Sequence, residues 1–151
     1  MKLVLAILGA TIALAAIPSP SAAQTVTFSV TPSTFTYPSA SPDTSPVVTG
    51  QQLTLSYRVT SNAGHTWTIT VQAQTDLVSG SSSIPAGNVT WTATPAPFVN
   101  GTLSTTVQTL AQGSGNVSTT KYGYLTFSLK NLWTYAAGTY SHTVVFTFSA
   151  G

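Results

Sequence analysis

The sequence contains no cysteine and no glutamate, and its 151 residues include only four lysines or arginines and two aspartates. Without cysteine the fold has no disulfide, so its stability must come from the hydrophobic core alone. Beyond the first residues the only cations are Arg58, Lys121 and Lys130, too few and too scattered for the basic surface that binds nucleic acid or acidic membranes. We therefore expect neither of those partners.

The shortage of acids also argues against catalysis. A typical glycosidase needs two carboxylates roughly 5 to 9 Å apart, but this chain offers only Asp43, in a proline-rich stretch, and Asp76, at the end of an expected strand. A serine nucleophile needs a base and an orienting acid, which the shortage of acids makes hard to supply. His65 and His142 alone make a poor metal site. His142 falls on the inward face of its strand, which favours a core histidine. We expect no enzyme, no catalytic residue, no metal and no cofactor.

Residues 1–23 have the pattern of a signal peptide that is removed on export. Lys2 precedes an apolar run over Leu3–Ala16, and Ser21-Ala22-Ala23 supplies small residues for cleavage. The apolar run is too short to predict a membrane-spanning helix, so we expect no membrane insertion. We predict cleavage after Ala23 and a secreted protein, extracellular or at the cell surface, whose residues 24–151 form one domain.

Strict alternation of apolar and polar residues organises that domain. In the final stretch, Ala137–Ala150, the side chains of Tyr140, His142, Val144, Phe146 and Phe148 share one face, as in a half-buried β-strand. Such an aromatic face needs a second sheet about 10 Å away. Further strands are predicted over Gln24–Val30, Thr34–Tyr37, Leu53–Thr60, Thr66–Thr75, Val89–Ala93, Leu103–Leu110 and Tyr122–Leu129.

The predicted fold is all-β, an antiparallel immunoglobulin-like β-sandwich of about seven strands. The runs Leu53–Thr60 and Thr66–Thr75, separated by a short Asn/Gly turn, predict a hairpin. Ser79–Gly87 and Gln112–Thr120 are expected to be loops, and Leu132, Trp133 and Tyr135 are expected to plug one end of the core. Gly138-Thr139-Tyr140 is similar to the tyrosine corner of such sandwiches, although an aromatic at a strand start explains it equally well.

The N-terminal part of the domain, residues 24–46, predicts a strand followed by a proline-rich spacer over Pro38–Pro46. We hypothesise that this strand completes the sheet of an identical subunit by strand addition, which would make a homo-oligomer. The alternative is that it is the first strand of its own sandwich. The residues of the exchanged segment would be Thr25, Val26, Phe28 and Val30.

The polar faces of the predicted strands carry Thr, Ser and Gln instead of the mixed charges of most soluble proteins. Such faces suit close contact with another surface, because no charge loses its water there. We therefore expect a structural or adhesive role, with a cell-wall polymer or identical subunits as partner.

A carbohydrate-binding module is the alternative. Trp133 is its candidate sugar platform, since strand phase places Trp67 and Trp91 in the core. An ice-binding protein, with Thr66, Thr68, Thr70, Thr90, Thr92 and Thr94 as one array, is a third and weaker alternative.

Two short motifs resemble the WxL-type surface domains of bacteria. One is Trp67-Thr68-Ile69 within H-T-W-T-I-T-V-Q, and the other is the closing stretch with Phe146-Thr147-Phe148. This resemblance implies non-covalent association with the cell wall, with Ile69 standing where the family has leucine. The final strand is also similar to those of coat- and pilin-like secreted sandwiches.

Overall fold

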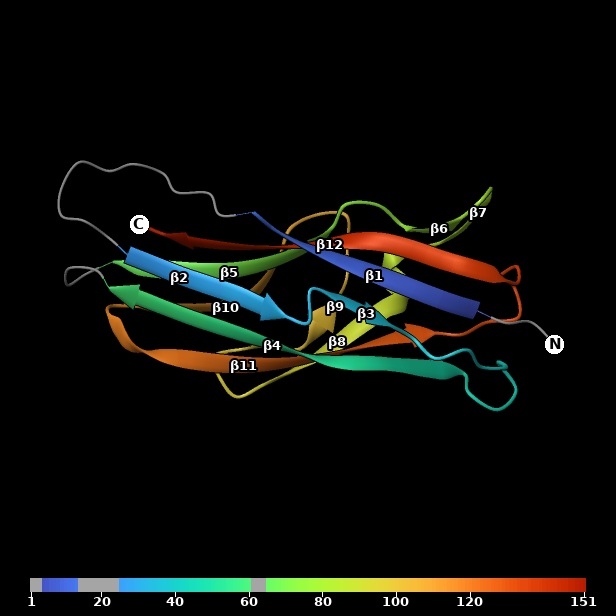
Figure 1. The fold of residues 1–151 in the computed structure, drawn as a ribbon, viewed down its shortest axis with the longest axis horizontal. Helices are drawn as coiled ribbons and strands as arrows, with labels where there is room; N and C mark the ends of the chain where they lie inside the picture. The colour runs from blue at the N-terminus through green and yellow to red at the C-terminus, as the bar shows by residue number, and fades with distance from the viewer. Residues whose placement is uncertain (1–3, 14–24, 61–64) are drawn as a thin grey trace.

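The structure is a computed structural model that describes residues 4–13, 25–60 and 65–151. It is an all-β protein of two packed sheets, which confirms the predicted class (Figure 1). Among these residues the one helical element is the 3-10 turn η1, Ala86–Asn88, and none is a helix long and apolar enough to cross a membrane.

We call the larger sheet A. Its hydrogen-bonded order is β10 (Gln108–Ser114), β5 (Thr66–Ala73), β12 (Gly138–Ala150), β1 (Val4–Ala13) and β3 (Thr34–Thr36). A small hairpin of β6 (Leu77–Ser79) and β7 (Ser82–Ile84) continues the sheet beside β12. All these pairs are antiparallel except β1 with β12, which is parallel.

We call the smaller sheet B. Its order is β2 (Thr25–Thr31), β4 (Val47–Thr60), β11 (Val117–Lys130), β8 (Val89–Thr94) and β9 (Gly101–Thr102), and every pair is antiparallel. The two long strands β4 and β11 form its centre. Apolar and polar residues alternate along both strands, so one side of each strand is buried and the other is mainly polar.

Aromatic side chains from both sheets fill the space between them. Tyr57 of sheet B lies 5.0 Å, centroid to centroid, from Trp67 of sheet A, and Trp67 stacks on Phe148 at 6.1 Å. Near the other end, Phe35 of β3 stacks on Phe127 of β11 at 5.3 Å. The core therefore crosses between the sheets along their whole length, as the aromatic inner face of β12 predicted.

Three glycines in the strands make room for these rings. A side chain at Gly101, Gly113 or Gly123 would collide with the ring of Trp91, Trp67 or Phe98 respectively. Glycine within a strand often marks such a close approach. Each of the two buried tryptophans thus lies over a glycine of the neighbouring strand, β9 for Trp91 and β10 for Trp67.

The predicted hairpin of Leu53–Thr60 with Thr66–Thr75 is wrong. Both runs are strands, but β4 belongs to sheet B and β5 to sheet A, so the chain crosses between layers at this point. Each strand buries its apolar side, and Tyr57 and Trp67 meet across the core instead of side by side in one sheet. The Asn/Gly turn itself lies outside the described residues.

Several expected loops and ends also differ. Ser79–Gly87 contains β7 and part of a hairpin that buries Leu77 and Ile84. Gln112–Thr120 is mostly strand, at the end of β10 and the start of β11, whereas Leu103–Leu110 reaches strand only from Gln108. These segments are rich in Gly, Ser and Thr, so local composition gave no sign of the pairing that neighbouring strands impose on them.

At the other end of the core, Tyr135 is buried as expected, but Leu132 and Trp133 are each 42% exposed and do not plug it. The hydroxyl of Tyr140 donates to the backbone oxygen of Ala136 at 3.0 Å. The proline-rich spacer is held against the body, since the side-chain amide of Asn131 donates to the backbone oxygens of Ala40 and Ser45.

Candidate functional site

The outer side of sheet B is a broad surface of hydroxyl groups, which we call the hydroxyl face. Its residues come from all five strands and lie in register across them. They are Thr25, Thr27, Ser29 and Thr31 of β2, Thr49, Gln52, Thr54 and Ser56 of β4, Thr126 and Ser128 of β11, Thr90, Thr92 and Thr94 of β8, and Thr102 of β9. Hydrogen bonds join some neighbours, such as Ser29 to Ser56 at 2.7 Å between their hydroxyl oxygens.

Two tyrosines stand on this hydroxyl face. Tyr122 and Tyr124 of β11 are 53% and 38% exposed, and Tyr124 lies in register with Thr54 on one side and Thr94 on the other. Residues two apart on a strand are about 7 Å apart, so the rings are neighbours on the same face. The only cations of sheet B's outer side, among the described residues, are Arg58 and Lys130 near its two ends.

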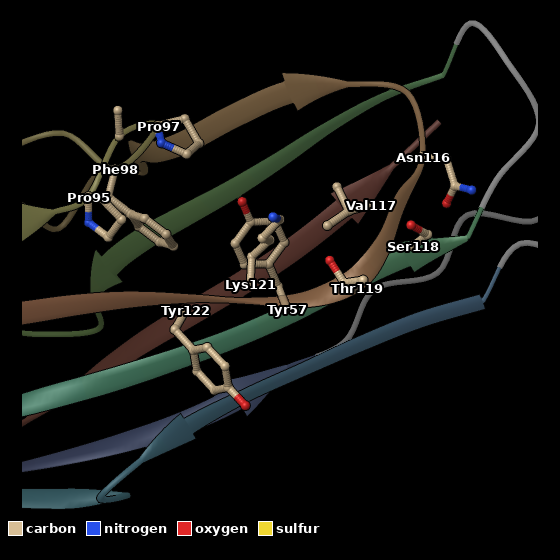
Figure 2. Close-up of a pocket in the computed structure, with 11 residues that line it drawn as sticks. Tyr57, Pro95, Pro97, Phe98, Asn116, Val117, Ser118, Thr119, Lys121 and Tyr122 are labelled. Carbon is tan, nitrogen blue, oxygen red and sulfur yellow. The ribbon is translucent and has the colours of Figure 1, made fainter.

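A pocket of about 490 Å³ adjoins the hydroxyl face at Tyr122. Figure 2 shows Pro95, Pro97 and Phe98 on one side of it and the turn between β10 and β11 on the other, with Tyr57 and Lys121 between them. The turn contributes the amide of Asn116, and the start of β11 contributes the hydroxyls of Ser118 and Thr119. Burial raises the pKa of Tyr57, so its hydroxyl stays protonated.

The chemistry of this combined surface suits a neutral or weakly acidic sugar. Aromatic faces stack on the apolar side of sugar rings, whereas hydroxyl and amide groups exchange hydrogen bonds with the sugar's own hydroxyls. Lys121 places one cation at the pocket. Apart from Arg58 and Lys130 near its two ends, the face has no charged side chain in the described residues, which lowers the cost of covering it.

The structure buries Trp67 and Trp91, as strand phase predicted, and leaves Trp133 partly exposed. The indole nitrogen of Trp133 donates to Asp43 at 2.8 Å, which connects the end of β11 to the proline-rich spacer. Trp133 therefore stands apart from the two tyrosines of the hydroxyl face, on the segment between β11 and β12. Nothing in the described residues adds a second tryptophan to it.

The six threonines expected to form one array lie on two sheets. Thr66, Thr68 and Thr70 belong to β5 of sheet A, and Thr90, Thr92 and Thr94 belong to β8 of sheet B. The outer faces of the sheets point in opposite directions, so these residues do not form one array. Only the second set contributes to the hydroxyl face.

The two motif segments do come together. Phe148 pairs with Ile69, and Ala150 with Trp67, in the antiparallel contact of β12 with β5. The side chains of Trp67, Ile69, Phe146 and Phe148 are all buried. In this chain the motif-like residues therefore form core contacts instead of an outward-facing site.

The acids and the buried histidine serve separate structural contacts. Asp76 accepts a hydrogen bond from the backbone nitrogen of Ala86 at 2.8 Å, which links the two ends of the segment that contains β6 and β7. His142 is 6% exposed, and among the described residues neither ring nitrogen has a hydrogen bond of ordinary geometry. Burial lowers the pKa of His142 to about 4, although the Thr75 backbone and the charge of Asp76 act weakly in the opposite direction.

The predicted exchange segment forms β2, which pairs with β4 of the same chain at the edge of sheet B. Val26 and Phe28 are half-buried and Val30 is buried, with the ring of Phe28 5.8 Å from that of Phe148. Pairing within one chain is the arrangement of a single copy, and exchange between copies stays a prediction.

Two features of the structure were not predicted from the sequence. The tyrosines were detectable, because the alternation that points Leu125 and Phe127 inward places Tyr122 and Tyr124 outward. The strand β1 was not detectable, because its residues have the sequence pattern of a leader.

A comparison of the chain with models of known protein families found no match, and a comparison with curated proteins found none either.

Proposed function

We propose that this chain is a secreted bacterial protein with a structural or adhesive role at the cell surface, bound there without a covalent link. In this proposal residues 1–23 are removed on export, and the rest is an immunoglobulin-like sandwich that associates with a cell-wall polymer, as the resemblance to WxL-type domains implies. The observation that carries it is the hydroxyl face with Tyr122 and Tyr124 exposed on its central strand, β11.

The solvation of the surface supports this role. A protein that stays free in solution usually keeps a mixed charged surface, whereas the described part of this chain presents rows of hydroxyls that pair with one another across strands. Contact with a hydrated polymer replaces water by further hydroxyl groups and leaves no buried charge. The two exposed rings add apolar contact area where the polymer would lie.

The test is sedimentation of residues 24–151 with isolated bacterial cell walls. We expect the wild type to bind, and the double variant Tyr122→Ala/Tyr124→Ala to bind about tenfold more weakly, since two lost ring contacts cost about 1 to 3 kcal/mol together. Binding should change little between low and high salt, because hardly any charge takes part.

Trp133→Ala is the matched control. It removes an aromatic residue of similar exposure that lies away from the hydroxyl face, so we expect unchanged binding. Equal binding by the double tyrosine variant and the wild type would refute the role of the hydroxyl face, and loss of binding on Trp133→Ala would move the site to the β11–β12 connection.

A carbohydrate-binding module is the second candidate, and the pocket beside Tyr122 favours it. Its aromatic floor, hydroxyl rim and single Lys121 suit one sugar unit at the end of a chain. Sedimentation with chitin and cellulose beside the cell walls separates the two functions: a module for foreign glycans prefers the purified polysaccharide, and a surface protein prefers the walls.

A further inference from the structure

The strand β1 lies inside sheet A, with a strand on each side. Figure 1 shows it between β12 and β3, and the sheet order agrees. It pairs with β12 over ten positions, from Val4 with Gly138 to Ala13 with Thr147. On its other side it pairs with β3, from Ile7 with Thr36 to Gly9 with Thr34. Yet β1 lies wholly within the predicted leader.

Removal of the leader would open a slot between β12 and β3. One edge of β12 is covered by β5 and β6, and its other edge is covered only by β1 in the described structure. An unpaired edge of this length exposes a row of backbone donors and acceptors. The slot would also expose the core beneath it, where Tyr140, Val144 and Phe146 now lie buried.

Both walls of the slot are attached to the body independently of β1. β12 is held by its seven-position pairing with β5. β3 is held by the ring of Phe35, which stacks on Phe127 and meets the edge of Tyr37 at 5.5 Å. Since neighbouring strands lie about 4.8 Å apart, the opening left between the walls is the width of one strand.

We propose that the strand Thr25–Thr31 of a second copy fills this slot after the leader is removed, so that mature chains join head to tail. This inference rests on the secretion part of the proposed function, and it names the partner as the chain itself. The donor has the required character: Val26, Phe28 and Val30 alternate with Thr and Ser, and no residue of the segment is charged.

Exchange also improves the pairing of the donor. In its own chain β2 is an edge strand with β4 as its single neighbour, whereas in the slot it would lie between β12 and β3 and pair on both sides. Its apolar residues would continue to face a core, because they share one side of the strand. Cleavage after Ala23 places this segment at the free end of the mature chain, where it is able to enter another copy.

Refilling of the slot by the chain's own β2 is opposed by Pro32. Only Pro32 and Ser33 separate β2 from β3, so a fold-back would need a two-residue hairpin. The favoured two-residue hairpin turns require a positive φ at their first position, and proline is fixed near −65°. The donor is therefore directed to another copy.

The experiment begins from the whole chain with a protease site inserted between Ala23 and Gln24, which we call the cleavable chain. Light scattering coupled to size-exclusion chromatography measures its mass before and after cutting. We expect one chain per particle while β1 fills the slot, and a concentration-dependent shift to two or more chains per particle after the cut.

Two variants place one aspartate on opposite sides of the donor. Val26→Asp puts a charge on the side that faces the core of the slot, so we expect the cut chain to stay a monomer. Thr27→Asp adds the same charge to the solvent side, beside Arg58 in register, and we expect assembly as in the wild type. A cut wild type that stays monomeric, or cut Val26→Asp that assembles or aggregates as the wild type does, would overturn the proposal.

The outcome is separate from that of the wall-binding test. A cut chain that remains a monomer but sediments with cell walls would end this inference and leave the proposed function intact. Assembly of a chain that does not bind walls would do the reverse. Mass spectrometry of the exported protein tests the shared premise, since a mature chain that retains Val4–Ala13 would end the inference and remove the secretion part of the proposal.

Discussion

Sheets A and B differ in where their strands come from. All five strands of sheet B lie within residues 25–130, so the sheet with the hydroxyl face is complete without the leader. Sheet A takes β1 from residues 4–13 and without it separates into β3 and the part around β12. One layer is therefore complete within residues 25–130, whereas the other depends on a strand that lies within the proposed leader.

The largest expected effect comes from the core phenylalanines of the two sheets. In the uncut cleavable chain, Phe127→Ala in sheet B and Phe146→Ala in sheet A should each lower the free energy of unfolding by about 3 to 5 kcal/mol. After the cut, in the Val26→Asp background that stays monomeric, Phe146 loses part of its cover and its substitution should cost less. Denaturant titration of both variants, before and after the cut, measures the difference; equal costs throughout would break the contrast between the sheets.

Titration of His142 should give the next largest effect. Its pKa in the fold is about 4, below the ordinary value of 6.5, because burial disfavours the charged ring. Above pH 6.5 the ring is neutral in both folded and unfolded states, so the stability is complete there. As the pH falls toward 4 the unfolded chain gains a proton that the folded chain does not, and up to about 3 kcal/mol is lost.

Urea titrations between pH 7 and 4 measure this loss, and the variant His142→Leu should remove the part that depends on the histidine. His142 lies opposite Leu8 of β1 in the sheet. In the cut monomer we expect its ring to be hydrated and the loss to shrink. A loss of the same size in His142→Leu would assign the pH dependence to other groups.

The smallest effect is expected for Tyr140→Phe, which removes the hydroxyl that donates to Ala136. A typical hydrogen bond contributes about 1 kcal/mol to stability, so the melting temperature should fall by a few degrees. Tyr140 lies opposite Ala6 of β1, so removal of β1 should admit water to this hydroxyl and make the substitution less costly after the cut. An equal cost before and after the cut would show that this corner does not depend on β1.

The sequence predicted the long strands well, and for a simple reason. In Gly138–Ala150 and in the Tyr122–Leu129 part of β11 the alternation continues over enough residues to identify both the strand and its buried side. The neighbour of each strand in its sheet was predicted less well. The residues Asn62-Ala63-Gly64 have the composition of a hairpin turn, yet β4 and β5 lie in different layers. Alternation tells which face of a strand is buried but not which strand lies beside it.

The candidate site was predicted only in part. Residues with outward phase were assigned correctly to solvent, but which of them meet depends on sheet order, so one threonine array became two. Tyr122 and Tyr124 carried a usable signal in their phase. The sequence gives no signal that Val4–Ala13 forms a strand of the sheet, because a leader and a buried strand both require an apolar, uncharged run.

Asn131 and Trp133 restrict how the N-terminal part of the chain is able to move. Through Ala40, Ser45 and Asp43 they fasten the proline-rich spacer to the body, so the only joint between β2 and the fixed part of the fold is Pro32-Ser33. A filament built by donation of β2 would consequently have two-residue joints between its sandwiches. Such a filament would be stiff, and its measured persistence length should exceed the length of several subunits.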